Sequence, residues 1–202
     1  MGYTVPFMRL FAGDANRSVC AMPAAQGAEF WPRDGRGLTL ITEEAELPFP
    51  DASIDRILLV HDLEFAELLK PNLQEIWRVL KADGRVLICI PNRTGLWSRS
   101  DRTPFGQGTP YSAAQMRYFL RDNLFSIERV ERALFVPPFR SLIGLSAAPV
   151  WEKIGRALFP TFAGVNIVEA RKQIYGGLAI PSENRIQIRG RRIVPIRPMP
   201  VS

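Results

Sequence analysis

The sequence predicts an α/β fold in which a mostly parallel β-sheet is covered by helices. Two observations support this prediction. Short runs such as residues 85–90 (RVLICI) are apolar at successive positions, as is typical of strands buried on both faces. Between two such runs the apolar residues recur with the period of an α-helix, so that strand, helix and strand follow one another along the chain.

The length and composition indicate one domain with a short tail. A chain of 202 residues with 47% hydrophobic residues can bury one substantial core. We expect this domain to span residues 1–181. Residues 182–202 contain five arginines and one acid, so they contribute +4 to the formal charge of +6. We expect this Pro- and Arg-containing tail to be disordered, although such a segment could also hold phosphates or acidic lipid.

Three short apolar runs in the first 60 residues predict buried strands. They are residues 18–22 (SVCAM), 38–42 (LTLIT) and 56–60 (RILLV). Turn residues separate them, first Gly35 and Gly37, then Pro48, Pro50 and Asp51. Each run is too short and too apolar for an amphipathic helix.

A helix is predicted between the third run and residues 85–90. Pro71 suits the first turn of a helix, and Gly84 suits its end. Four apolar residues between them share one helix face at positions i, i+3, i+4 and i+7: Leu73, Ile76, Trp77 and Leu80. We therefore assign this face to the core.

The second half of the chain contains a long loop, two further helices and two further strands. The loop spans residues 92–111, and Ser112 and Gln115 have the spacing of a capping box that opens a helix. Residues 126–136 and 164–174 are expected to be strands. A helix over residues 149–158 is expected between them, with four apolar residues turned inward: Val150, Trp151, Ile154 and Leu158.

Several function classes are excluded by simple counts. Cys20 and Cys89 lie in apolar strand-like runs, and the chain has a single histidine, so we expect no zinc or other metal site. No segment reaches the 18 or so apolar residues that a membrane span requires. We therefore expect a soluble, cytoplasmic protein. The sequence gives no indication of an oligomeric state.

Polar side chains follow three of the predicted strands. In an open α/β sheet, ligands bind outside the carboxyl ends of the strands, so residues 43–47, 61–64 and 91–93 should line one crevice. These segments contain carboxylates, the imidazole of His61 and an amide. Carboxylates can accept hydrogen bonds from ribose hydroxyls or an exocyclic amine while apolar side chains hold a base, so the crevice suits an adenosine-like ligand.

The same residues resemble a known family. Residues 44–65 (EAELPFPDASIDRILLVHDLEF), followed by 73–92 (LQEIWRVLKADGRVLICIPN), are similar to the second half of a class I S-adenosylmethionine-dependent methyltransferase of the small-molecule type. The resemblance extends over residues 2–174. It implies a Rossmann-like three-layer sandwich with a mostly parallel sheet, and a C-terminal antiparallel hairpin formed by residues 126–136 and 164–174.

The resemblance also implies a binding site for S-adenosyl-L-methionine. Eight residues are expected to contact this cofactor. Glu44 and Ala45 occupy the family's adenine-binding positions, with Glu46 and Leu47 beside them. His61 lies beside the cofactor's methionine and the substrate entrance. Gly2 and Tyr3 correspond to the end of the glycine-rich turn, and Met22 to the end of the second strand. Asp55 is expected to hold a turn.

The beginning of the chain departs from the family pattern. Residues 1–6 resemble the end of the glycine-rich turn, so the helix, first strand and most of the glycine-rich motif that normally precede it are absent from the sequence. Loss of a central strand would leave two strand edges unpaired. We therefore expect an N-terminally truncated sequence whose true start lies upstream. Met22 and Pro23 also stand where the family usually has an acid.

The resemblance implies methyl transfer from S-adenosylmethionine to a small-molecule acceptor. No residue is assigned as a catalytic base, and His61 is expected to contact the cofactor or the substrate. The alternative is a catalytically silent module that binds nucleic acid or acidic partners through its arginine-rich tail. We rank this alternative second, and do not expect nucleic-acid binding, because residues 1–181 carry only +2 of the net charge.

Overall fold

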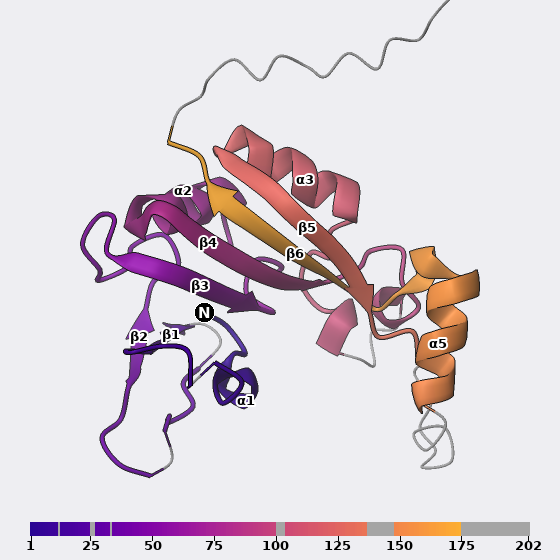
Figure 1. The fold of residues 1–202 in the computed structure, drawn as a ribbon, viewed down its shortest axis with the longest axis horizontal. Coiled ribbons are helices and arrows are strands. Elements are labelled where there is room, and N and C mark those ends of the chain that lie inside the picture. Colours follow the sequence, from indigo (N-terminus) through magenta and orange to yellow (C-terminus); the bar gives the residue numbers. More distant parts are fainter. Residues whose placement is uncertain (12, 25–26, 33, 100–103, 137–147, 175–202) are drawn as a thin grey trace, which may run out of the picture.

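A computed structural model describes residues 1–11, 13–24, 27–32, 34–99, 104–136 and 148–174. The strands form two sheets (Figure 1). The smaller sheet pairs β1 (Cys20–Pro23) with β2 (Thr39–Thr42) in parallel. The larger sheet has the order β3-β4-β6-β5, with bounds Ile54–Val60, Leu80–Pro91, Val165–Lys172 and Phe125–Ala133.

The larger sheet is mixed in direction. β3 and β4 run parallel, whereas β6 lies between β4 and β5 and is antiparallel to both. β5 and β6 confirm the predicted C-terminal antiparallel hairpin. Since β5 therefore runs in the same direction as β3 and β4, the carboxyl ends of these three strands lie at the same edge of the sheet.

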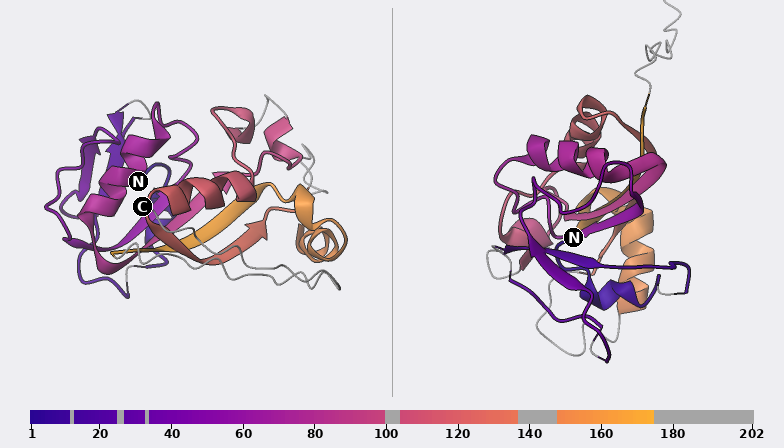
Figure 2. Two further views of the ribbon diagram at one scale, coloured as in Figure 1. Left: turned by 90° about the horizontal axis from the view of Figure 1, so that it is seen from above. Right: turned by 90° about the vertical axis from the view of Figure 1, so that its left-hand side faces the viewer.

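Two helices cover one face of the larger sheet. α2 (Leu69–Val79) and α3 (Ala113–Asp122) lie on the same side of it (Figure 2). Ser112 and Gln115 form the predicted capping box at the start of α3. The core lies between these helices and the strands, and its fully buried side chains include Leu73, Ile76, Met116, Leu120, Ile88 and Val168. The predicted inward face of α2 is therefore confirmed.

The opposite face of the larger sheet is more polar. Along β4, fully buried Val86, Ile88 and Ile90 alternate with half-buried residues. Arg85 on this second face forms ion pairs with Glu128 of β5 and Glu169 of β6.

Among the described residues, no helix is both long and apolar enough to cross a membrane.

The end of α2 differs from the prediction. The helix ends at Val79, and residues 80–84, which were predicted to continue it as far as Gly84, belong to β4. The backbone of Leu80 is already extended, and Leu80 is the partner of Ile54 in the sheet. Its side chain is nevertheless buried, which explains why it matches the helical periodicity.

The prediction that α5 turns its apolar face inward is wrong. α5 (Ala148–Leu158) lies beyond the end of the sheet (Figure 1). Its side chains Val150 and Leu158 are 56% and 67% exposed, and Trp151 and Ile154 are 38% and 42% exposed. Helical periodicity identifies an apolar face, but it does not show whether a neighbouring element covers that face.

The first residues of the chain lie beside the end of β3. Gly2 forms an isolated parallel bridge with Val60, and Tyr3 N–H donates to the Val60 carbonyl at 2.7 Å. The other edge of β3 is occupied by β4, so Met1–Tyr3 lie on the free edge. α1 (Val5–Met8) follows directly. The basic tail and Arg102 of the long loop lie outside the described residues.

Candidate functional site

A cavity of about 330 Å³ lies where β1 ends and α1 begins. Three of the residues predicted to contact a cofactor line it: Gly2, Tyr3 and Met22. The remaining lining residues are Val5, Pro23, Gly27, Ala28 and Glu29. The structure thus brings together residues from two separate parts of the sequence, as the prediction requires.

The end of β3 leaves no space for a side chain at Gly2. Its φ is +70°, a conformation that favours glycine. A Cβ at this position would lie 2.3 Å from the Val60 carbonyl oxygen and 3.0 Å from the Asp62 Cβ. Glycine therefore allows the backbone of residues 1–3 to approach the end of β3 closely.

His61 begins the turn that follows β3. Its φ is +52°, which is unusual for a residue with a side chain. Its backbone N–H donates to the Cys89 carbonyl at 3.1 Å, and its Nδ1 lies 2.7 Å from Glu64 Oε1. The backbone of His61 lies beside Gly2, and contact of both residues with one cofactor stays a prediction.

Asp62 and Glu64 are buried carboxylates that the sequence did not single out as cofactor contacts. Asp62 has no exposed surface, and Asn72 Nδ2 donates to its Oδ2 at a long 3.4 Å. Burial raises the pKa of Asp62 above its ordinary value. Within the described residues, Asp62 Oδ1 and Glu64 Oε2 have no hydrogen-bond partner. Both therefore keep an acceptor that a ligand could use.

Glu44 lies in the same acidic environment. Burial, together with the nearby carboxylates of Asp62, Glu43 and Glu67, raises the pKa of Glu44 to about 7. The side chain is half-buried and can therefore take or lose a proton near neutral pH. Glu44 is near Asp62, which lies in the turn that follows β3 and contains His61. Glu44 does not line the 330 Å³ cavity.

The other predicted residues of this segment differ in exposure. Ala45 and Glu46 are exposed in a tight turn, in which the Thr42 hydroxyl donates to the carbonyls of Glu43 and Glu46. Leu47 has its side chain in the core, where it is 5% exposed. Contact between these three residues and a cofactor stays a prediction.

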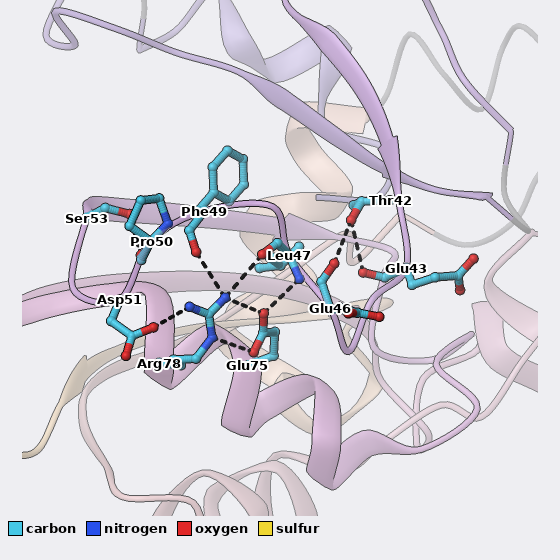
Figure 3. A network of polar contacts seen from close by, with 10 residues as sticks. All are labelled: Thr42, Glu43, Glu46, Leu47, Phe49, Pro50, Asp51, Ser53, Glu75 and Arg78. Atoms are coloured by element: carbon cyan, nitrogen blue, oxygen red, sulfur yellow. Dashed lines mark hydrogen bonds and ion pairs between the residues drawn. The ribbon is translucent and has the colours of Figure 1, made fainter.

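Glu75 and Arg78 on α2 hold the segment that follows this turn (Figure 3). Glu75 Oε1 accepts from Leu47 N–H at 2.7 Å. Arg78 donates to Glu75, to the Leu47 and Phe49 carbonyls at 3.1 and 3.0 Å, and to Asp51. These bonds lower the pKa of Glu75, since they favour its ionised form. The pair thus fixes the path of the chain from the acidic turn to β3.

The sequence analysis missed this pair. Glu75 and Arg78 have the i, i+3 spacing of a helical ion pair, which is a detectable signal. That spacing does not reveal, however, that both side chains reach a loop almost 30 residues earlier. Asp55, which was expected to hold a turn, instead lies within β3 and forms an exposed ion pair with Lys81.

A second cavity, of about 260 Å³, lies between α5 and the loop after β4. It is apolar and is lined by Leu96, Phe135, Trp151, Ile154, Gly155, Phe159 and Phe162. Gly155 allows the close approach of Phe135, because a Cβ there would lie 2.4 Å from the Phe135 Cβ. Phe135 N–H donates to Glu152 Oε1 at 2.9 Å, which ties α5 to the end of β5.

Aromatic rings connect this second cavity with His61. The His61 and Phe105 ring centroids are 5.1 Å apart, and those of Phe105 and Trp97 are 5.2 Å apart, both in edge-to-face arrangements. Trp97 Nε1 donates to the Val136 carbonyl at 2.6 Å, and Leu96 beside it lines the cavity. The long loop therefore forms an apolar wall from His61 toward α5.

Neither cysteine is placed to act as a nucleophile. Burial raises the pKa of Cys89 to about 11, and burial also raises the pKa of Cys20, so both thiols stay protonated at neutral pH. In the part of the chain that the structure describes, no cluster of three or more His, Cys, Asp or Glu side chains could hold a metal ion.

Comparison with known proteins agrees with this architecture. Residues 7–88 match the sequence profile of the family described as "Methyltransferase domain". No curated protein matches the chain. The fold is similar to that of an S-adenosylmethionine-dependent methyltransferase from Archaeoglobus fulgidus, with a TM-score of 0.58, 16% identity and coverage of 82% of this chain and 80% of that chain.

Two further structures are similar. One is an S-adenosylmethionine-dependent methyltransferase from Mesorhizobium loti, with a TM-score of 0.53, 14% identity and coverage of 82% and 86%. The other is a possible histamine N-methyltransferase from Thermotoga maritima, with a TM-score of 0.48 and 18% identity, of which this chain spans 64%. The matched segment and the shared fold confirm the predicted resemblance: the chain has the Rossmann-like fold of S-adenosylmethionine-dependent methyltransferases.

Replacing Arg78 with alanine should loosen the acidic turn without unfolding α2. The Leu47 and Phe49 carbonyls lose their donors and Glu75 loses its partner, so hydrogen exchange at the Leu47 amide should accelerate by on the order of tenfold. Exchange measured by NMR or mass spectrometry tests this. Arg121→Ala on α3, where the arginine is exposed, is the matched control. Equal exchange rates in the two variants would contradict the clamping role of Arg78.

Glu44→Gln should make stability less dependent on pH. Because the folded-state pKa of Glu44 is raised, the unfolded chain loses this proton first as pH rises from 4.5 to about 7, and stability falls over that range. A pKa difference of that size corresponds to roughly 3 kcal/mol. Glu44 is only half-buried, so solvent screening reduces the effect to about 1 kcal/mol.

Urea unfolding of wild type, Glu44→Gln and the exposed control Glu46→Gln at pH 5 and pH 8 measures this effect. The stability gained by Glu44→Gln over wild type should be about 1 kcal/mol larger at pH 8 than at pH 5. Glu46→Gln should show no such increase. The same pH response in both variants would contradict the raised pKa of Glu44.

Proposed function

We propose that this protein transfers a methyl group from S-adenosylmethionine to a small-molecule acceptor. The observation that carries the proposal is the cavity of Gly2, Tyr3 and Met22, in which Gly2 pairs with Val60 at the carboxyl end of β3. The matched methyltransferase segment and the shared fold support the choice of this chemistry.

The residues present fit the cofactor in two respects. Gly2 lets the backbone that lines the cavity lie close to the end of β3, since a Cβ at this position would clash with the Val60 carbonyl oxygen. Asp62 Oδ1 lacks a donor within the described residues, and Glu44 titrates near neutral pH, so acceptors are available for hydroxyl and amino groups. Gly2, Tyr3 and Met22 would hold the methionine side, and Glu44 to Leu47 the adenine.

When bound, the cofactor supplies an activated methyl group on a sulfonium. The remaining requirements are alignment of the acceptor with that methyl and the exclusion of water. The wall of Phe105 and Trp97 beside His61 serves both purposes, because it is apolar and is fixed by the Trp97–Val136 hydrogen bond. No metal is required for this reaction.

The second cavity supports an acceptor with an apolar part. It lies at the end of the wall that begins at His61, and its lining is apolar and largely aromatic. Pockets of this kind bury the hydrocarbon or aromatic portion of small ligands. Cys20 and Cys89 are free cysteines, which suits the reducing environment of a cytoplasm.

Isothermal titration calorimetry with S-adenosylhomocysteine on the full chain tests the proposed cofactor site. Wild type should bind it saturably. Gly2→Ala should weaken binding about tenfold or more, since a clash or a strained φ of at least 1.4 kcal/mol gives that factor.

Gly13→Ala is the matched control, because a Cβ at Gly13 would meet nothing within 4 Å. It should bind S-adenosylhomocysteine as wild type does. An absence of saturable binding in wild type would rule out the proposed function. An equal loss of affinity in the two glycine variants would show that S-adenosylhomocysteine does not bind in the cavity lined by Gly2.

The second cavity should bind a fluorescent apolar probe, 1-anilinonaphthalene-8-sulfonate. Ile154→Asp should weaken this binding about tenfold, because it places a charge in an apolar lining. Val150→Asp on the same helix is the control, since Val150 is exposed and does not line the cavity. Equal fluorescence titrations for the two variants would show that the probe binds the exposed face of α5 instead.

A further inference from the structure

The imidazole of His61 is held by a buried carboxylate. Glu64 Oε1 lies 2.7 Å from Nδ1, and the Glu64 side chain is only 1% exposed, whereas that of His61 is 22% exposed. The other oxygen, Oε2, has no partner among the described residues. One ring nitrogen is therefore fixed from the protein interior, and Nε2 remains as the nitrogen that a ligand can meet.

The backbone keeps this pair in place at some cost. His61 has a positive φ, which is a strained conformation for a residue with a side chain and commonly occurs at functional sites. The Glu64 carbonyl accepts from Thr109 N–H at 2.8 Å. This approach requires Gly108, where φ is +70° and a Cβ would lie 2.5 Å from the same carbonyl oxygen. The long loop thus packs directly against Glu64.

Packing also fixes the orientation of the ring. Phe105 contacts the His61 ring edge-to-face at 5.1 Å and is itself supported by Trp97. The titratable groups that face the pair are Asp62 in the same turn, Cys89 of β4 and Tyr111 of the long loop. The charge of Glu64 acts on all three of them. The titratable groups around the pair therefore include carboxyl, thiol and phenol groups, and the Met1 ammonium acts on Asp62 beside it.

We propose that His61 is the general base of the methyl transfer and that Glu64 is its positioning residue. This inference rests on the proposed function. The acceptor is then a molecule with a hydroxyl group, or with a neutral nitrogen that carries both a lone pair and an N–H. Its heteroatom bonds to the methyl carbon as the carbon–sulfur bond breaks, the sulfur keeps that electron pair, and the acceptor's proton passes to Nε2. The proton on Nδ1 stays in the hydrogen bond to Glu64.

The tautomer of His61 tests this proposal without an acceptor. Because the chain has a single histidine, ¹⁵N NMR of the full chain shows one imidazole. At a pH where the ring is neutral, we expect the Nδ1–H tautomer, with an unprotonated Nε2. In Glu64→Leu the Nδ1–H loses its acceptor, so the Nε2–H form should become substantially populated. Glu67→Leu, at an exposed acid of the same loop, should retain the wild-type tautomer.

Reactivity gives a second measurement. Carbethoxylation of His61 by diethyl pyrocarbonate, followed by mass spectrometry, should be several-fold slower in Glu64→Leu than in wild type or Glu67→Leu. An Nε2–H tautomer in wild type would overturn the proposal, because Glu64 would then donate its proton to Nδ1 and Nε2 could accept none. An unchanged tautomer and reactivity in Glu64→Leu would overturn the role of Glu64.

Binding of S-adenosylhomocysteine separates this inference from the proposed function. Calorimetry should show the same affinity, within about threefold, for wild type and Glu64→Leu, since Glu64 acts on His61 and not on the cofactor. Normal binding together with an Nε2–H tautomer rejects the base and leaves the proposed function intact. An absence of binding in wild type rejects both.

Discussion

The abrupt turn of the backbone at His61 is the constraint on which the site depends. β3 ends at Val60, and the positive φ of His61 directs the chain away from the sheet. The His61 N–H is still held by the Cys89 carbonyl of β4, so the turn begins from a fixed point. Asp62 and Glu64 consequently face the interior while the imidazole keeps an exposed edge. A more gradual exit from β3 would separate the imidazole from its carboxylate and from Gly2.

Local patterns in the sequence predicted most of the fold. Apolar runs identified the strands, and the i, i+3, i+4 spacing identified the buried face of α2. The predictions are wrong where contacts between distant elements determine the structure of a residue or its exposure. Leu80 satisfies the helical period, yet pairing with Ile54 makes it the first residue of β4. α5 has a clear apolar face, but its position beyond the sheet leaves Val150 and Leu158 exposed. Periodicity describes one element, whereas exposure depends on its neighbours.

The hydrogen bonds that support the candidate site could not be predicted from the sequence. The rule that ligands bind at the carboxyl ends of parallel strands directed attention to His61 and Glu44, and the resemblance added Gly2 and Met22. Three of the eight predicted residues, Gly2, Tyr3 and Met22, line one cavity. The supporting bonds are not local in sequence: Arg78 reaches Phe49, and Glu75 reaches Leu47, across 29 and 28 residues. Such contacts become visible only when the helix is placed against the loop.

Burial of the two carboxylates of Asp62 and Glu64 at this turn is unfavourable for the protein alone. Each buried acceptor without a donor costs about 1–3 kcal/mol, and Asp62 and Glu64 each have one such oxygen within the described residues. Asn72 and His61 satisfy only the other oxygens. A ligand that brings hydroxyl or amino donors to this turn would offset part of that cost, and its binding would stabilise the fold by the same linkage. The buried carboxylate oxygens without donors therefore both destabilise the protein alone and allow this turn to bind a ligand.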